Sequence, residues 1–176
     1  MHRVRLARAG RVCRAGAWQV PSPLRRYRYR LGFEVDPAGR GRLLVVGLNP
    51  STASLTRRDP TVDTCCAGIA RAHGFRELEM TNLFGLRSTD KSALLRVADP
   101  VGRNHDVHLI AAVRAADCIL LAWGALFAPI VAERAACVEQ LVRRHARGPL
   151  CVLARNADGS PAHPLYRRLD SPLLPA

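Results

Sequence analysis

The chain has 176 residues, 48% of them hydrophobic, with 27 basic and 14 acidic side chains and a formal net charge of +13 at pH 7. Its length and composition predict one globular domain that buries its own core. No apolar run approaches the roughly 18 residues that a membrane-spanning helix needs, and the Arg-rich first residues lack the apolar stretch of a secretory signal, so we expect neither.

The positive charge is unevenly distributed. Residues 1–30 hold nine Arg and no acidic residue, which gives +9, whereas residues 31–176 hold 18 basic and 14 acidic residues, which gives +4. We therefore predict a basic, weakly structured arm over residues 1–24 and a single α/β domain over residues 25–176. A basic arm adds salt-dependent affinity for phosphates; simple disorder and a misplaced start codon stay open as alternatives.

Six cysteines are spread along the chain without a C-x-x-C pair and without metal-ligand spacing to the histidines. Several of them fall in apolar segments, where a thiol acts as a small hydrophobic side chain. We expect free structural thiols, no bound metal and a reducing, cytoplasmic location. The cysteines are Cys13, Cys65, Cys66, Cys118, Cys137 and Cys151.

The first predicted element is a half-buried strand over residues 27–35, where apolar and polar side chains alternate. A turn at residues 36–39 follows, and then comes the apolar run Leu43-Leu44-Val45-Val46. A continuous run of this kind is typical of a strand that is buried on both faces. Together the two segments predict a hairpin.

Three helices are predicted further along the chain. Asp59 and Pro60 begin the first, because Asp is a good N-cap and Pro suits the first helical position, and Gly74 ends it. Asn104 caps the second, which runs to about residue 115, and Pro129 begins the third. The predicted apolar faces are Val107, Ile110, Ala111 and Val113 in the second helix, and Val131, Ala135, Val138, Leu141 and Val142 in the third.

Further strands are predicted at residues 78–83, 119–121 and 150–153. Strands that alternate with helices predict an α/β fold in which helices cover both faces of a parallel sheet. We expect a three-layer α/β/α sandwich with a central, mainly parallel four-stranded sheet and the N-terminal strand added antiparallel.

The segments that follow the parallel strands are the candidate functional segments, because ligands bind beyond the carboxyl ends of such strands. Asn49, Asn82 and His163 all fall there. Each also has a purely structural interpretation: Asn before Pro is a common turn, a buried amide can brace a loop, and a loop histidine can be solvated. Their joint placement favours a site.

Other residues in or near the segments that follow the strands also have two interpretations, which the sequence leaves open. Trp123-Gly124 fits packing with a tight exit turn, or a wall of the site. Asp59 fits helix capping, or proton chemistry. Arg57 and Arg58 either meet a phosphate or face water.

Four segments, in their order along the chain, resemble the motifs of the uracil-DNA glycosylase superfamily. Gly47-Leu48-Asn49-Pro50-Ser51 is similar to the G-I-N-P-G motif of the mismatch-specific thymine/uracil enzymes. Met80-Thr81-Asn82 resembles a strand end whose Asn reads a flipped base, and Leu120–Gly124 resembles an L-L-W-G strand end. His163-Pro164-Leu165 resembles the start of the H-P-S-P-L loop.

The whole pattern is more closely similar to a bacterial family catalogued as a domain of unknown function (DUF1643). Its members carry Arg-Tyr-Arg-Leu, G-L-N-P-S-T-A, D-P-T, N-L-F and a terminal H-P-L-Y. The matching segments here are Arg28–Leu31, Gly47–Ala53, Asp59–Thr61, Asn82–Phe84 and His163–Tyr166.

The glycosylase resemblance implies roles for three residues. Asn82 would read the edge of an extruded base through its paired donor and acceptor. Asn49 would orient a water toward the sugar C1′ without deprotonating it, because an amide has no useful basicity. His163 would hydrogen-bond the negative charge that develops on the departing base. No metal or organic cofactor is required.

The resemblance also implies the remaining candidate residues. Those expected to bind substrate are Gly47, Leu48, Pro50, Ser51, Thr52, Asp59, Asn82, Phe84, Trp123, Gly124, Pro164 and Tyr166. Those expected to bind phosphate are Arg57, Arg58, Arg167 and Arg168.

Two departures from the glycosylase pattern broaden the expected substrate. Ser51 stands where uracil-specific members carry a bulky aromatic residue, and His163–Tyr166 lacks the serines that pinch DNA, a role open to Arg167-Arg168. The expected function is hydrolysis of an N-glycosidic bond, with nucleic acid or a free nucleotide or nucleoside as partner. The alternative is a non-catalytic binding module of the same fold. We expect a monomer that does not bind membranes.

Overall fold

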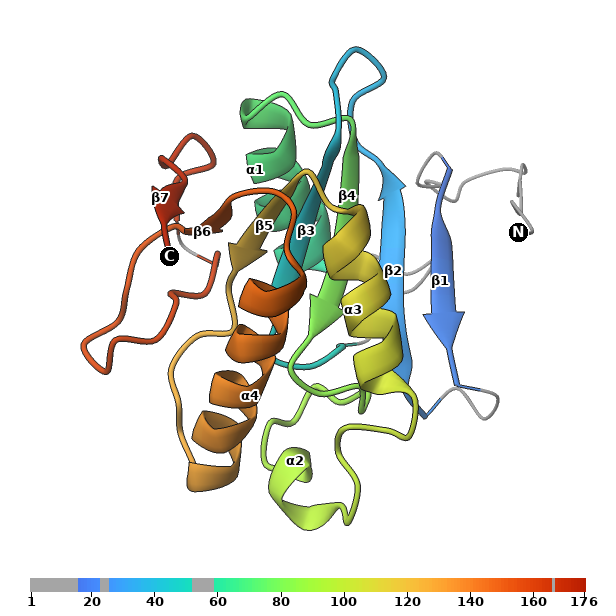
Figure 1. The fold of residues 1–176 in the computed structure, drawn as a ribbon, viewed down its shortest axis with the longest axis vertical. Coiled ribbons are helices and arrows are strands. Elements are labelled where there is room, and N and C mark those ends of the chain that lie inside the picture. The colour runs from blue at the N-terminus through green and yellow to red at the C-terminus, as the bar shows by residue number, and fades with distance from the viewer. Residues whose placement is uncertain (1–15, 23–25, 52–58, 166) are drawn as a thin grey trace.

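The computed structural model describes residues 16–22, 26–51, 59–165 and 167–176, which form one mixed α/β unit (Figure 1). Seven strands join in one sheet, in the order β1-β2-β4-β3-β5-β6-β7. The strands are β1 (Trp18–Pro21), β2 (Arg28–Glu34), β3 (Arg42–Gly47), β4 (Glu77–Asn82), β5 (Cys118–Leu121), β6 (Leu150–Val152) and β7 (Leu174–Pro175). The helices are η1 (Thr61–Cys66, π-helical), α1 (Ala67–Ala72), α2 (Ala93–Arg96), α3 (His105–Ala115) and α4 (Pro129–His145).

The centre of the sheet is parallel and its edges are antiparallel. β4, β3, β5 and β6 run parallel, as their apolar runs predict. β1 and β2 extend the sheet antiparallel at one edge, and β7 does so at the other. The fold is therefore mixed α/β, but the sheet has more strands and more antiparallel pairing than the sequence predicts.

The predicted hairpin between residues 27–35 and 43–46 is wrong. β2 pairs with β4, where Leu31 lies opposite Met80, and β3 lies on the far side of β4. The four residues of the run 43–46 are fully buried, and a strand buried on both faces is most stable with a partner on each side. That requirement places β3 between β4 and β5, although the turn before it is short enough for a hairpin.

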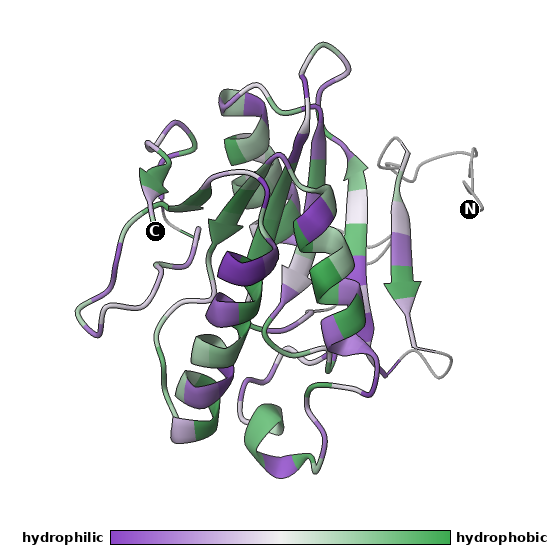
Figure 2. Cartoon of the chain, viewed as in Figure 1, coloured by the Kyte–Doolittle hydropathy of each residue, from purple (hydrophilic) through white to green (hydrophobic). Residues whose placement is uncertain are grey.

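Helices pack on both faces of the sheet (Figures 1 and 2). Leu44, Val46 and Leu121 point to the face that α3 and α4 cover. Leu43, Val45 and Leu120 point to the opposite face, against η1 and α1. Because side chains alternate along a strand, an uninterrupted apolar run supplies both cores at once.

The predicted apolar face of α3 is wrong in part, because Val113 is buried as predicted but Ala111 and Val107 are exposed. Val107 is 69% exposed, whereas Leu109, Ala112 and Val113 are buried together with His105. These four positions share one helical face at the period of 3.6 residues. Because His105, the first of these positions, is polar, the buried face does not appear as an apolar pattern in the sequence. In α4, by contrast, the predicted positions Val131, Ala135, Val138 and Val142 are all buried.

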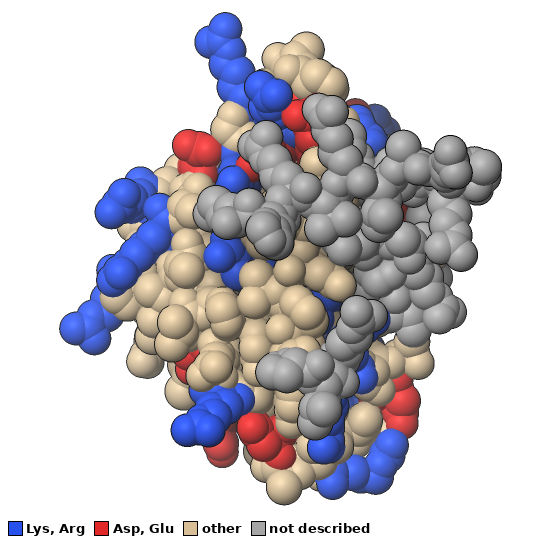
Figure 3. All heavy atoms as spheres, turned by 90° about the vertical axis from the view of Figure 1, so that its right-hand side faces the viewer, with Lys and Arg blue, Asp and Glu red and all other residues tan. Residues whose placement is uncertain are grey.

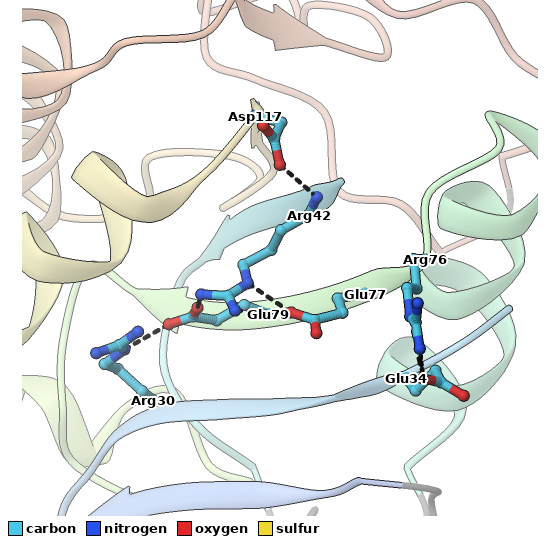
Figure 4. A network of polar contacts seen from close by, with 7 residues as sticks. All are labelled: Arg30, Glu34, Arg42, Arg76, Glu77, Glu79 and Asp117. Atoms are coloured by element: carbon cyan, nitrogen blue, oxygen red, sulfur yellow. Dashed lines mark hydrogen bonds and ion pairs between the residues drawn. The ribbon is translucent and has the colours of Figure 1, made fainter. Parts of the chain in front are cut away.

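An ionic network lies where the parallel strands begin (Figure 4). The Glu79 carboxylate is fully buried and accepts hydrogen bonds from Arg30 on β2 and, at 3.2 Å, from Arg42 on β3. Arg42 also binds Glu77 at 2.7 Å. A buried carboxylate is tolerated only when it is paired in this way, so the network ties β2, β3 and β4 together.

Part of the predicted arm is a strand. Trp18 of β1 lies opposite Gly32 of β2, and its indole occupies the space where a side chain at Gly32 would stand. Residues 1–15 and 23–24 of that arm lie outside the described residues. Within the residues that the structure describes, no helix combines the length and the apolar character that crossing a membrane requires.

Candidate functional site

A cavity of about 260 Å³ lies beyond the carboxyl ends of β3, β4 and β5. Nine of the predicted site residues line it: Gly47, Leu48, Asn49, Ser51, Asp59, Asn82, Trp123, His163 and Pro164. Residues far apart in the sequence therefore do converge on one rim, as the parallel order predicts.

Other predicted residues do not reach this cavity. Pro50, Phe84 and Gly124 are buried beside it, and Arg167 and Arg168 are exposed away from it. Arg168 binds Asp170 instead. Thr52, Arg57, Arg58 and Tyr166 lie outside the described residues.

The floor of the cavity is apolar. Val45 of β3, Met80 of β4 and Ala122 after β5 line it together with Val62 and Cys66 of η1. Burial raises the pKa of the Cys66 thiol far above its ordinary value, so this sulfur stays protonated and acts as an apolar surface. A flat, mostly apolar group fits such a floor.

The Asn49 amide nitrogen is used by the protein itself. It donates to the carbonyl oxygens of Ser88 at 2.8 Å, Pro50 at 3.2 Å and Leu86 at 3.5 Å. Three carbonyl acceptors on one side define which end of the amide is nitrogen. The side-chain oxygen is left for the cavity, where it acts only as an acceptor.

Asn82 differs from Asn49 in having no such contacts. It is 5% exposed and lines the cavity, yet its side-chain amide makes no hydrogen bond to the described residues. A Cβ atom added at Gly47 would stand 2.8 Å from its Oδ1. The amide lines the cavity and has no partner among the described residues, so this donor–acceptor pair is available to a ligand.

The backbone around Asn82 is held on two sides. The Leu83 and Phe84 amides donate to the carbonyl oxygens of Gly47 and Leu48, at 2.8 and 3.0 Å. From the other side, Arg134 of α4 donates to the Leu83 carbonyl at 2.8 Å and pairs with Asp106 of α3. These contacts fix the strand end that carries Asn82.

The geometry of His163 defines its tautomer. The Leu165 amide donates to Nδ1 at 3.2 Å, so in the neutral ring the proton sits on Nε2. Burial lowers the pKa of His163, the positive charge of Lys91 lowers it further, and Asp59 acts in the opposite sense. The loop is held by Gly124, whose amide donates to the Pro161 carbonyl at 3.0 Å. His163 is thus a neutral hydrogen-bond donor.

Asp59 caps a helix, as one of its two interpretations predicts. Its carboxylate accepts from the Val62 amide at 3.2 Å and from the Ser51 hydroxyl at 2.5 Å. The six residues of η1 that follow are π-helical, a rare geometry that is frequent at functional sites. Thr61, Val62 and Cys66 of this turn line the cavity.

Trp123 serves both of its predicted purposes. It packs in the core below α3 and α4, is 3% exposed, and also forms part of the cavity wall. Its indole nitrogen has no hydrogen-bond partner in the part of the chain that the structure describes. The Trp123 ring therefore acts as an apolar part of the cavity wall.

Of the ten residues in the cavity lining that sequence reasoning missed, two are basic. Arg28 falls on the polar positions of an alternating strand, yet it is 3% exposed and lines the cavity; no local pattern signals this. Lys91 also lines the cavity. Lys91 is the only lysine in an Arg-rich chain, which could have drawn attention to it. Codon usage explains the same composition, so the sequence did not identify Lys91 as a site residue.

No group of three or more His, Cys, Asp or Glu side chains is placed to hold a metal ion among the residues described by the structure. The lining instead combines amides, one imidazole and two cations above an apolar floor. Such a mixture suits a planar polar molecule with an anionic group.

The comparisons with known proteins place this chain in a family. No curated protein and no solved structure is significantly similar to it. One family profile, described as a protein of unknown function (DUF1643), matches residues 28–165, which include every described residue of the cavity lining. The chain belongs to this family.

Proposed function

We propose that the protein is a glycosylase-type enzyme that binds a nucleobase in this cavity and hydrolyses an N-glycosidic bond in nucleic acid or in a nucleotide. The observation that carries the proposal is the Asn82 side-chain amide at the cavity wall, which makes no hydrogen bond to the described residues. A nucleobase edge offers the complementary acceptor and donor. The similarity of the four strand-end segments to uracil-DNA glycosylase motifs supports the same assignment.

The proposed mechanism assigns the nucleophile to a water held by Asn49. The side-chain oxygen of Asn49 accepts a hydrogen bond from this water and so directs an oxygen lone pair toward the sugar C1′. The contact from Asn49 Nδ2 to the Ser88 carbonyl keeps the amide in this orientation. Positioning, rather than deprotonation, is the contribution that an amide can make.

The departing base is stabilised by His163 in this proposal. As the C1′–N bond breaks, the base takes both bonding electrons and becomes an anion; the water oxygen bonds to C1′, and the proton that it then loses is taken up by the base anion, which leaves as the neutral base. The Nε2–H of His163 donates to this developing charge, and the Leu165 contact keeps the proton on that nitrogen. A donor that is already oriented needs no reorganisation during the reaction.

The test is incubation of the pure protein with oligonucleotides that carry uracil, thymine mismatches or modified bases, and with free nucleosides and nucleotides. We expect release of free base. His163→Ala should lower the rate about 10²–10³-fold and Asn49→Ala about 10²-fold, whereas His145→Ala, at the far end of α4, should leave it unchanged. No base release from any of these substrates would refute the enzyme.

Because the Asn49 side chain also braces residues 86–88, its variant needs a folding control. We expect Asn49→Ala to lower the free energy of unfolding by about 1–2 kcal/mol, measured by urea denaturation. If the variant loses activity at temperatures where it stays folded, the loss is due to the missing contact with the nucleophilic water and not to unfolding.

A second candidate is binding without catalysis. Asp59 is the only carboxylate in the described cavity lining, and it caps η1. No lining carboxylate is left to act as a base. This function predicts nucleobase binding that depends on Asn82 but survives Asn49→Ala, with no base release. For either function we propose a cytoplasmic monomer.

A further inference from the structure

The cavity lining changes character with depth. The innermost residues are buried and include Met80, Cys66 and Asn82. Asn49 and His163 are half-buried, and Thr89 and Lys91 are exposed at the mouth. A ligand whose base lies at Asn82 and whose sugar lies beside Asn49 therefore directs its next group outward, to the mouth.

The Lys91 ammonium is a cation without a counter-ion at this mouth. It makes no hydrogen bond and no ion pair with the described residues. The adjacent Asp90 carboxylate binds Arg96 at 2.7 Å, and the Asp59 carboxylate is used by Ser51 and Val62. Neither acid forms an ion pair with Lys91 in the described part of the chain, although Asp59 keeps its negative charge in the same lining, so the ammonium group itself can contact a ligand.

The segment that carries Lys91 is held against the site. The Ser88 hydroxyl donates to the Asp90 carbonyl at 2.9 Å and accepts from the Asp90 amide at 3.0 Å, which closes a tight turn. The Ser88 carbonyl accepts from Asn49. This turn sets Lys91 beside the residue to which we assign the water, and its charge lowers the pKa of His163.

We propose that the cavity takes a phosphorylated nucleoside and that Lys91 binds its phosphate at the mouth, an inference that rests on the proposed nucleobase binding. A lysine ammonium is a compact point charge with three donors, which suits a phosphate monoester. A volume of about 260 Å³ is small for a ligand pocket, so it takes one nucleotide at most; the single strand used below distinguishes a free nucleotide from one flipped out of a strand. Arg28 adds a second positive charge to the described lining.

Calorimetry with matched ligands tests the phosphate contact. The probes are deoxyuridine and thymidine, their 5′-monophosphates, and a five-nucleotide single strand that contains deoxyuridine. We expect the monophosphates to bind about tenfold more tightly than the nucleosides. Lys91→Met should abolish that advantage and Lys91→Arg should keep it. Arg103→Met is the matched control, because it removes an exposed charge outside the cavity lining.

A second measurement observes Lys91 directly. Since it is the only lysine, selective ¹³C labelling of lysine gives one side-chain signal in an NMR spectrum. Inorganic phosphate should shift this signal, and a 5′-monophosphate should shift it at lower concentration.

The outcomes separate this inference from the proposed function. If nucleosides bind through Asn82 but their monophosphates bind no more tightly, only this inference is overturned. The same holds if the monophosphates still bind more tightly than the nucleosides in Lys91→Met. Phosphate that binds at Lys91 while no nucleoside binds at all overturns the nucleobase function and this inference together. Tighter binding of the single strand than of the monophosphates overturns the assignment to a free nucleotide.

Discussion

Asn49 and Asn82 carry the same amide group, but the fold uses them in opposite ways. From the sequence, Asn82 is open to bracing a loop or to reading a base, and Asn49 to a simple turn or to a site role. In the structure Asn49 braces residues 86–88, and the Asn82 side chain makes no hydrogen bond to the residues that the structure describes. The sequence identifies both as candidates but cannot distinguish them, because the bracing carbonyl belongs to Ser88, on a loop whose path depends on the tertiary fold.

Gly47 predicts a selective way to disturb Asn82. Its backbone suits any residue, but a Cβ would stand 2.8 Å from the Asn82 Oδ1. We expect Gly47→Ala to displace that amide, lowering nucleobase affinity about tenfold or more while unfolding free energy falls by about 1 kcal/mol. Calorimetry and urea denaturation measure the two effects.

Gly68→Ala is the control for that substitution. Its Cβ would meet the exposed, flexible Leu169 side chain at the same 2.8 Å, far from the cavity lining. Unchanged affinity in Gly47→Ala would show that Asn82 does not read the ligand.

His163 gives a second prediction at this scale. Nitrogen NMR at pH 7 should show a neutral ring with the proton on Nε2 and a pKa below the ordinary value of about 6.5. Lys91 lowers this pKa, so Lys91→Met should raise it, whereas Arg103→Met should not. A proton on Nδ1 would contradict the proposed role.

Individual strands and helices could be predicted where one kind of periodicity dominates. The four parallel strands and α4 follow their apolar patterns. β7 and α2 could not be predicted, because elements of two and four residues carry no period. The buried face of α3 was missed because His105 is polar yet buried, a consequence of its packing against Tyr29 and Arg134.

The network around Glu79 predicts where an ion pair matters. Glu79→Gln removes a fully buried charge and leaves Arg30 and Arg42 without their shared carboxylate. We expect a loss of about 1–3 kcal/mol in unfolding free energy. The matched variant is Glu34→Gln, whose partner Arg76 is 52% exposed; it should cost less than about 1 kcal/mol. Equal effects in urea denaturation would disprove the ranking.

The stability of the whole molecule should fall in mild acid. Burial lowers the pKa values of His105, His108 and His163. The pKa of a histidine in the unfolded chain is about 6.5. Above that pH these histidines are neutral in both the folded and the unfolded protein, so the free energy of unfolding does not change. Below it the unfolded chain binds more protons than the folded protein, so the free energy of unfolding falls. Urea denaturation should show a lower midpoint at pH 5.5 than at pH 7.5.

His105 should account for much of that loss, because it is 1% exposed. The charged groups that face it are Asp106, which raises its pKa, and Arg134, which lowers it. His105→Gln should reduce the difference between the two pH values. A midpoint that rises toward pH 5.5 would contradict the assignment.

The expected phosphate affinity of the basic arm, residues 1–24, can be tested by deletion, and the start of β1 decides how much can be removed. Among the described residues in Figure 3, basic side chains lie in several separate groups, some of them beside acidic side chains. Because β1 begins at Trp18, a deletion through residue 30 would remove β1 and part of β2. Deletion of residues 1–15 alone should therefore be compared with the full chain, and we expect weaker, less salt-dependent DNA binding. If the affinity for DNA does not change, residues 1–15 do not contribute to phosphate binding.

The pairing of β2 with β4 has a consequence for synthesis on the ribosome. Gly32 pairs with Glu79, so β2 is complete well before its partner exists. At ~5–20 residues per second, this interval lasts several seconds. During it β2 has only β1 beside it, and a two-stranded ribbon is marginally stable in water. Nascent chains stalled shortly before β4 should therefore be cut readily by protease, and chains stalled after it has emerged should resist.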